Sequence, residues 1–79
     1  MAETITDPLA REILAALTRA RGPLTVEGVR DKIGAMHNGH LPYGDVYNRL
    51  VRLTALGVVE SMTLHVAGER ARMFWPSRG

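Results

Sequence analysis

The amino-acid sequence predicts an α+β domain in which three helices precede a C-terminal β-hairpin. Apolar residues recur every three or four positions in three stretches before Gly57, and they alternate with polar residues after it. Residues that start or stop helices stand at the boundaries of these stretches. The 79 residues have room for one domain, which we expect to span residues 1–79 around a small core.

The first helix is predicted over residues 8–21. Asp7 can accept a hydrogen bond from the free amides of the first turn. Pro8 suits the first helical position, because the amide hydrogen that proline lacks would have no partner there. An apolar stripe follows this helix and consists of Leu9, Ile13, Ala16, Leu17 and Ala20. Gly22 is expected to end the helix before a proline.

A short second helix is predicted over residues 26–33, with Thr25 as its N-cap and Gly34 as its end. Leu24 stands alone before this helix, where we expect a very short strand of one or two residues. Residues 35–42 contain an Asn-Gly pair and a proline, so they are predicted to form a loop rather than a helix.

The third helix is predicted over residues 43–56. Its core side, at helical spacing, is expected to consist of Val46, Leu50 and Leu53. Its opposite side carries Asp45, Asn48 and Arg52. Gly57 can adopt the left-handed conformation that closes a helix.

The alternating segment after Gly57 predicts a hairpin with strands over residues 58–66 and 69–75. If Val66 pairs with Glu69, one register places apolar residues opposite apolar ones and polar residues opposite polar ones. The apolar pairs are Leu64 with Ala71 and Met62 with Met73, and the polar pairs are His65 with Arg70 and Thr63 with Arg72.

Charge is distributed unevenly along the chain. Residues 1–45 carry five basic and six acidic side chains, whereas residues 46–79 carry five basic and two acidic ones. The positive excess therefore lies on the third helix and the hairpin. Nine of the ten basic residues are arginine, whose planar guanidinium can donate two hydrogen bonds to a phosphate or a guanine.

The pattern Val-Tyr-x-x-Leu-x-x-Leu from residue 46 to 53, followed by Leu-Gly-Val-Val at residues 56–59, resembles the third helix and turn of winged helix-turn-helix transcription regulators of the PadR, Fur and BlaI type. The order of elements over residues 8–75 is similar to theirs as well. The resemblance implies a third helix that enters the major groove of DNA and a hairpin wing that contacts the backbone or the minor groove.

On the third helix, the resemblance and the outward positions imply a DNA-binding set of Tyr43, Gly44, Asp45, Tyr47, Asn48, Arg49 and Arg52. On the wing, the polar face adds Thr63, His65, Arg70 and Arg72. Two members have alternative roles. Asp45 can instead serve the positive end of the helix dipole, and Arg49 can pair with Asp45 at i−4.

These patterns lead to two hypotheses of different kinds. The first is a sequence-specific, double-stranded DNA-binding transcription regulator of prokaryotic or phage type, acting as a repressor or an activator. A module of this size normally needs two copies for useful specificity, so a homodimer through the first helix or the C-terminal strand is expected, with Leu14 and Trp75 as apolar contacts. The alternative is a winged-helix module that binds a protein partner and no nucleic acid.

The sequence lacks the residues that other classes of protein require. No nucleophile and base, clustered acids or glycine-rich phosphate loop has the spacing of an enzyme site, so neither an enzyme nor a cofactor is expected. His37, His40 and His65 lack cysteine or clustered carboxylates around them, so no metal site is predicted. The absence of cysteine fits a reducing compartment, and no signal peptide or apolar run of about 20 residues is visible. We therefore expect a cytoplasmic protein.

Overall fold

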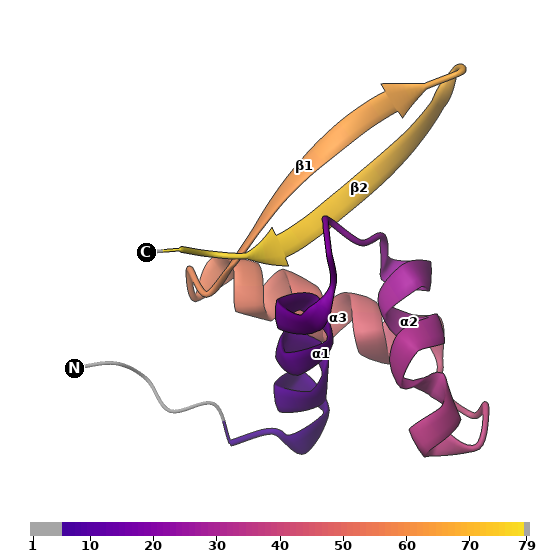
Figure 1. The fold of residues 1–79 in the computed structure, drawn as a ribbon, viewed down its shortest axis with the longest axis vertical. Coiled ribbons are helices and arrows are strands. Elements are labelled where there is room, and N and C mark those ends of the chain that lie inside the picture. Colours follow the sequence, from indigo (N-terminus) through magenta and orange to yellow (C-terminus); the bar gives the residue numbers. More distant parts are fainter. Residues whose placement is uncertain (1–5, 79) are drawn as a thin grey trace.

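The computed structural model describes residues 6–78, so residues 1–5 and 79 of the expected domain lie outside the described part. The elements follow in the order α1 (Pro8–Arg19), α2 (Val26–Gly34), the 3-10 turn η1 (Ala35–His37), α3 (Tyr43–Ala55), β1 (Val59–Val66) and β2 (Glu69–Pro76). In Figure 1, α1 and α2 stand side by side against α3, and the hairpin extends beyond the helices. The predicted α+β class, with three helices and a C-terminal hairpin, is confirmed.

Helix α1 begins as predicted but ends two residues early, at Arg19 instead of residue 21. Asp7 caps it by accepting a hydrogen bond from the Leu9 amide at 3.3 Å. Ala20 already has an extended backbone, because the chain must turn there to bring the following segment to the hairpin. The buried stripe consists of Ala10, Ile13, Ala16 and Leu17. Ala10 was absent from the predicted stripe.

Helix α2 has the predicted N-cap, since the Thr25 hydroxyl accepts from the Gly28 amide at 3.0 Å. The prediction that Gly34 ends this helix was wrong, and so was the prediction of an entirely non-helical segment over 35–42. Gly34 has helical dihedral angles, and the chain continues as the turn η1. It reverses instead at Asn38 and Gly39, whose φ angles are 54° and 74°. Asparagine and glycine are the residues that tolerate this left-handed conformation.

Helix α3 begins at Tyr43 and ends at Ala55, one residue before the predicted end. The three predicted core residues, Val46, Leu50 and Leu53, are all buried. Gly57 has a φ of 81°, as expected for the residue that closes the helix. The helix therefore presents one side to the core and leaves the other side free.

The hairpin has the predicted register over its whole length. Strand β1 begins one residue later than predicted, at Val59, and β2 ends one residue later, at Pro76. The pairs run from Val66 with Glu69 at the tip to Val59 with Pro76 at the base. Ala67 and Gly68 form the turn with φ angles of 52° and 81°, the two positive values that a type I′ turn requires.

A backbone bridge fastens the hairpin to the helices. Leu24 and Phe74 exchange hydrogen bonds of 2.9 Å and 2.8 Å, so the expected short strand at Leu24 exists as an isolated bridge. Phe74 is fully buried and joins Val59 in the core formed by the three helices. The polar face of the hairpin thereby points toward the helices at its base. No helix among residues 6–78 is long and apolar enough to cross a membrane.

Candidate nucleic-acid interface

The outward side of α3 is exposed, as the helical spacing predicts. Gly44, Asp45, Asn48 and Arg52 all lie on this exposed surface. Within residues 6–78, the side chains of Asn48 and Arg52 make no hydrogen bond or ion pair. Pro42, at the N-cap, provides no side-chain hydrogen bond to the first turn. Two unpaired polar side chains and an uncapped helix start therefore face solvent together.

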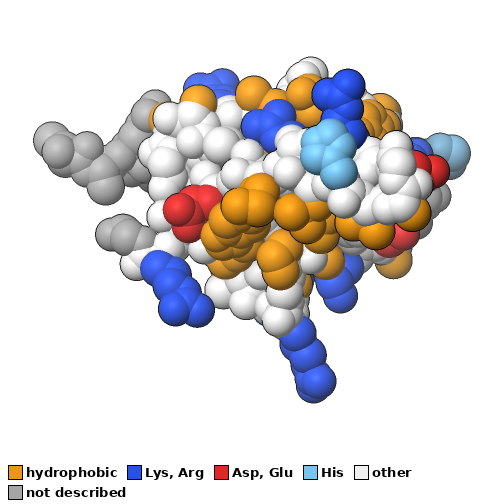
Figure 2. All heavy atoms as spheres, turned by 90° about the horizontal axis from the view of Figure 1, so that it is seen from above, with side chains coloured by type: hydrophobic (Ala, Val, Ile, Leu, Met, Phe, Trp, Pro, Cys, Tyr) orange, Lys and Arg blue, Asp and Glu red, His pale blue; other side chains and the backbone are white. Residues whose placement is uncertain are grey.

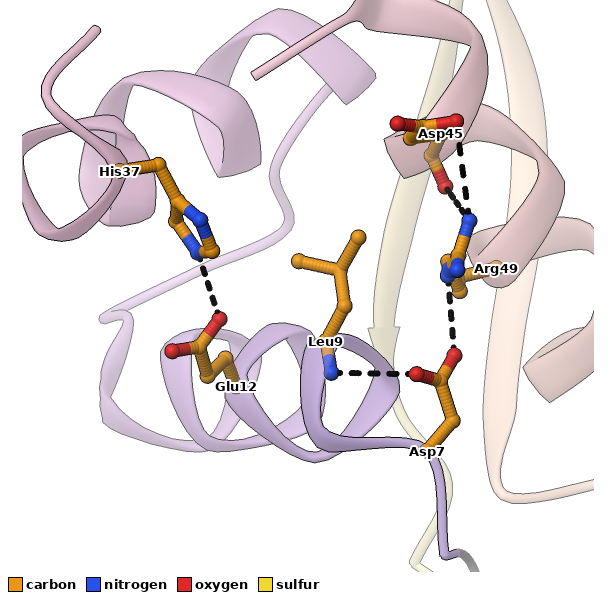
Figure 3. A network of polar contacts seen from close by, with 6 residues as sticks. All are labelled: Asp7, Leu9, Glu12, His37, Asp45 and Arg49. Carbon is orange, nitrogen blue, oxygen red and sulfur yellow. Dashed lines mark hydrogen bonds and ion pairs between the residues drawn. The ribbon is translucent and has the colours of Figure 1, made fainter. Parts of the chain in front are cut away.

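Arg49 lies at the edge of this surface and points toward α1 (Figure 3). Its Nε donates to Asp7 Oδ2 at 2.9 Å, and its Nη1 donates to the Asp45 carbonyl oxygen at 3.4 Å. Its Nη1 also lies 3.8 Å from Asp45 Oδ1. The alternative pairing of Arg49 with Asp45 is thus confirmed, and Asp7 is an additional partner that the sequence analysis missed. The Arg49 guanidinium therefore links α3 to Asp7 at the start of α1.

The three histidines differ in their surroundings. His37 Nε2 lies 2.8 Å from Glu12 Oε2 and links η1 to α1 (Figure 3). His40 follows in the exposed connection to α3, and His65 lies on β1. In the described part of the chain, no group of three or more histidine, cysteine or acidic side chains could hold a metal ion.

The polar face of the wing carries the predicted residues. His65 is paired with Arg70 and Thr63 with Arg72 across the two strands. Arg72 is held in place, because its Nη2 donates to Ser61 Oγ at 3.2 Å and its Cζ lies 5.2 Å from the centre of the Phe74 ring. The side chains of Thr63, His65 and Arg70 lie on exposed residues. This face therefore offers one guanidinium held by internal contacts, that of Arg72, and one with no internal partner among residues 6–78, that of Arg70.

A shallow groove of about 300 Å³ joins the wing to the beginnings of α2 and α3. It is lined by Thr25, Val26, Glu27, Tyr43, Tyr47, Glu69, Arg70, Ala71 and Arg72. Tyr43 and Tyr47 stack on each other, with ring centroids 6.2 Å apart and planes inclined by 11°. The fold thus gathers two predicted tyrosines and two predicted arginines, which are more than twenty residues apart in the chain, into one concavity.

Other predicted residues lie outside this groove. Asn48 and Arg52 are exposed farther along α3, and Thr63 and His65 are exposed on β1. Neither Thr25 nor Glu27, which do line the groove, was predicted to belong to the site. They reach it because the Leu24 bridge to β2 precedes α2 directly. The only feature of the sequence that indicated the approach of α2 to β2 was the isolated Leu24, for which a short strand was predicted.

The groove is electrostatically mixed. Glu27 and Glu69 lie in it together with Arg70 and Arg72, so its formal charges balance. The carboxylates weaken the attraction of this groove for a polyanion, whereas Arg52 lies outside it and makes no internal ion pair in the described structure. An anionic ligand would therefore be attracted more strongly by Arg52 than by the groove as a whole.

The helices, the Leu24 bridge and the hairpin together define a winged-helix domain. Among solved structures the chain is similar to Stf76 from the Sulfolobus islandicus plasmid-virus pSSVx, with a TM-score of 0.72 and 22% sequence identity. The match covers 92% of this chain and 86% of that one. It supports the same fold over almost the whole length. No protein-family model and no curated protein sequence matches the chain.

Proposed function

We propose that this protein is a sequence-specific, double-stranded DNA-binding transcription regulator. The observation that carries the proposal is the exposed, unpartnered side of α3, whose first two turns also contribute Tyr43 and Tyr47 to the wing groove. Asn48 and Arg52 on that side have no internal partners among residues 6–78, and Tyr47, which directly precedes Asn48, lines the groove together with Arg70. Unpaired polar groups of these kinds are suited to base edges and phosphates.

Helix α3 has 13 residues and is therefore about 20 Å long, a length that fits within the major groove. In this arrangement Asn48 lies at the centre of the outward side and can hydrogen-bond the N6 and N7 atoms of adenine. Arg52, one turn farther along, binds guanine or a phosphate. Asp45 is partly neutralised by Arg49, which reduces its repulsion of the DNA backbone.

The wing supplies affinity rather than sequence reading. Arg70 is exposed near the hairpin tip and can reach a flanking phosphate. The hydroxyl groups of Tyr43 and Tyr47 border the same groove and can donate to the next phosphate along the strand. Arg49 is assigned a positioning role in this proposal, because its guanidinium is already bound to Asp7 and Asp45.

A protein-binding module is the second candidate, and specific observations favour it. Val51 on α3 and Leu56, the residue directly after α3, are exposed by 37% and 40%, and apolar side chains gain little from contact with phosphates. Glu27 and Glu69 in the groove also oppose a polyanion. Salt dependence separates the two candidates, because displacement of counterions from DNA makes binding weaken steeply as salt rises.

The deciding experiment is fluorescence anisotropy with labelled duplexes, one a random pool and one the DNA upstream of the protein's own gene. A salt series begins at about 50 mM. We expect binding that weakens with salt and is tighter for one duplex. Arg19→Ala is a matched control, because Arg19 is an exposed arginine on α1 outside the proposed surface. Absence of binding to every duplex at the lowest salt would reject the proposal.

A further inference from the structure

The face of the hairpin opposite to the one that carries Arg70 and Arg72 is apolar and exposed. On β1, Met62, Leu64 and Val66 are exposed by 55%, 41% and 62%. Their cross-strand neighbours on β2 are Met73, Ala71 and Glu69, and Trp75 continues the same face at the base. Figure 2 shows hydrophobic side chains gathered in a band on the side of the molecule seen from above. Exposed apolar surfaces of this kind usually mark an interaction site.

This face continues into a groove of about 940 Å³ at the base of the hairpin. The opposite wall comes from the end of α1 and the segment after it. Its apolar lining consists of Leu17, Ala20, Pro23, Met62, Leu64, Met73, Trp75 and Pro76. Arg21 and Arg78 also line it. The surface is therefore a hollow with two guanidiniums toward the base and, beyond it at the hairpin tip, a ridge formed by the exposed Val66.

We propose that this apolar face binds the same face of a second copy of the chain in a two-fold symmetric dimer. The two-fold axis passes near the middle of the hairpin. It places the hairpin tip of each copy in the groove at the base of the other copy's hairpin, so that the ridge of one copy fills the hollow of the other. Leu64 of each copy then lies over Met62 and Met73 of the other. The exposed Val66 of each copy covers Trp75 of its neighbour.

The charges favour a second copy in this antiparallel orientation. Glu69 stands at the tip on the apolar face, and Arg21 and Arg78 stand at the base. None of these three side chains has a hydrogen-bond or ion-pair partner within residues 6–78. The two-fold arrangement brings the carboxylate of Glu69 to both guanidiniums of the other copy, twice per dimer. A parallel arrangement would instead place like charges together, which is unfavourable.

The size of the surface places the dimer among the small interfaces that are typical of weak association. Six residues of β-strand extend about 20 Å, and two strands with their side chains are about 10 Å wide. With the wall of the groove, each copy buries several hundred Å², less than the roughly 800 Å² per partner of a standard interface. The dimer is therefore weak, with a Kd in roughly the micromolar range.

This proposal does not rest on DNA binding. Arg70 and Arg72 lie on the opposite face of the same two strands, and Asn48 and Arg52 lie on α3, so the proposed DNA-binding side chains stay accessible in the dimer, although Glu69 and Ala71 border both surfaces. Association can therefore be measured without nucleic acid, and a failure of either proposal leaves the other unaffected.

Sedimentation equilibrium from about 1 μM to 1 mM tests the dimer. The wild-type chain is expected to pass from monomer to dimer across this range. Leu64→Glu places two carboxylates near the two-fold axis and is expected to raise Kd by about tenfold or more. Met36→Glu is the matched control, because Met36 is 67% exposed on η1, far from the hairpin in the chain, and this variant should associate like the wild type. Circular dichroism establishes that each variant is folded.

Charge reversal tests the orientation. Glu69→Arg is expected to weaken the dimer, and so is the pair Arg21→Glu with Arg78→Glu. Combining all three substitutions restores the attraction with opposite signs and should recover most of the lost affinity. A folded wild-type chain that is monomeric at about 1 mM, or a Leu64→Glu variant with unchanged association, would overturn the proposal. Failure of the triple variant to recover affinity would overturn the antiparallel arrangement.

Discussion

Arg49 on α3 and Asp7 at the start of α1 are joined by a hydrogen bond of 2.9 Å between Nε and Oδ2 (Figure 3). The other carboxylate oxygen of Asp7 accepts from the Leu9 amide at 3.3 Å. One carboxylate thus caps the first helix and holds the third, 42 residues later in the chain. Through this contact, the helix cap at the N-terminus helps to orient the helix that carries the proposed DNA-reading residues.

We expect Asp7→Ala to lower the free energy of unfolding by about 1–2 kcal/mol. About 1 kcal/mol comes from the lost cap, and about 0.2–1 kcal/mol comes from the half-exposed ion pair. Asp7→Asn keeps one oxygen for the Leu9 amide and loses the charge and the second acceptor, which Arg49 uses, so it should cost less than alanine. Urea unfolding measures both variants. Equal losses for alanine and asparagine would show that the cap contributes little.

The spacing of Asp45 and Arg49 on one helix predicts their pairing, because residues four apart are neighbours on a helix surface. The contact with Asp7 was not predictable in this way. It depends on how α1 packs against α3, which helical periodicity does not specify. The same limit explains Glu27 in the wing groove, since the start of α2 meets β2 only through the Leu24 bridge.

Phe74 is the residue on which attachment of the wing depends most. Its side chain is fully buried, and its backbone exchanges two hydrogen bonds with Leu24. We expect Phe74→Ala to cost about 3–5 kcal/mol, which is a large part of the stability of a small domain. Thermal unfolding should show a much lower Tm. Val66→Ala, at a residue 62% exposed on the neighbouring strand, should change stability by less than about 1 kcal/mol.

The alternation of apolar and polar residues predicted the register of the hairpin, but it could not show which face of the hairpin packs against the helices. The more apolar face, with Met62 and Leu64, is the exposed one. Phe74 lies on the polar face and is buried, because the bridge to Leu24 draws the base of that face onto the helices. Local pattern therefore specifies pairing within the hairpin, whereas its orientation on the domain depends on a contact fifty residues apart in sequence.

The hairpin turn contains a correctable strain. Ala67 has a φ of 52°, which the Cβ of alanine disfavours, while the glycine after it tolerates its φ of 81°. Ala67→Asn creates the Asn-Gly pair preferred in type I′ turns and should stabilise the domain by about 0.5–1 kcal/mol. The expected rise in Tm is a few degrees. An unchanged or lower Tm would mean that the turn relaxes in solution to another conformation.

Arg70→Ala tests the backbone contact of the wing. Its side chain is exposed and makes no hydrogen bond or ion pair in residues 6–78, so its removal should leave stability unchanged. DNA affinity should fall by a similar factor for every duplex, and the slope of log affinity against log salt should decrease by about 1. Arg72→Ala is a less direct test, because it also removes contacts with Ser61 and Phe74. An unchanged slope for Arg70→Ala would remove that residue from the interface.

Asn48→Ala tests sequence reading on α3. An asparagine that forms two hydrogen bonds with adenine contributes about 1–3 kcal/mol of discrimination against other bases. We expect the variant to lose affinity for the preferred duplex by about tenfold or more while its affinity for the random pool changes little. The salt slope should stay the same, since Asn48 carries no charge. Anisotropy is then measured with duplexes in which one base pair at a time is replaced. The position that Asn48 reads is the one at which replacement no longer weakens binding of the variant. Equal losses on the preferred duplex and the random pool would show that Asn48 contacts the backbone instead of a base.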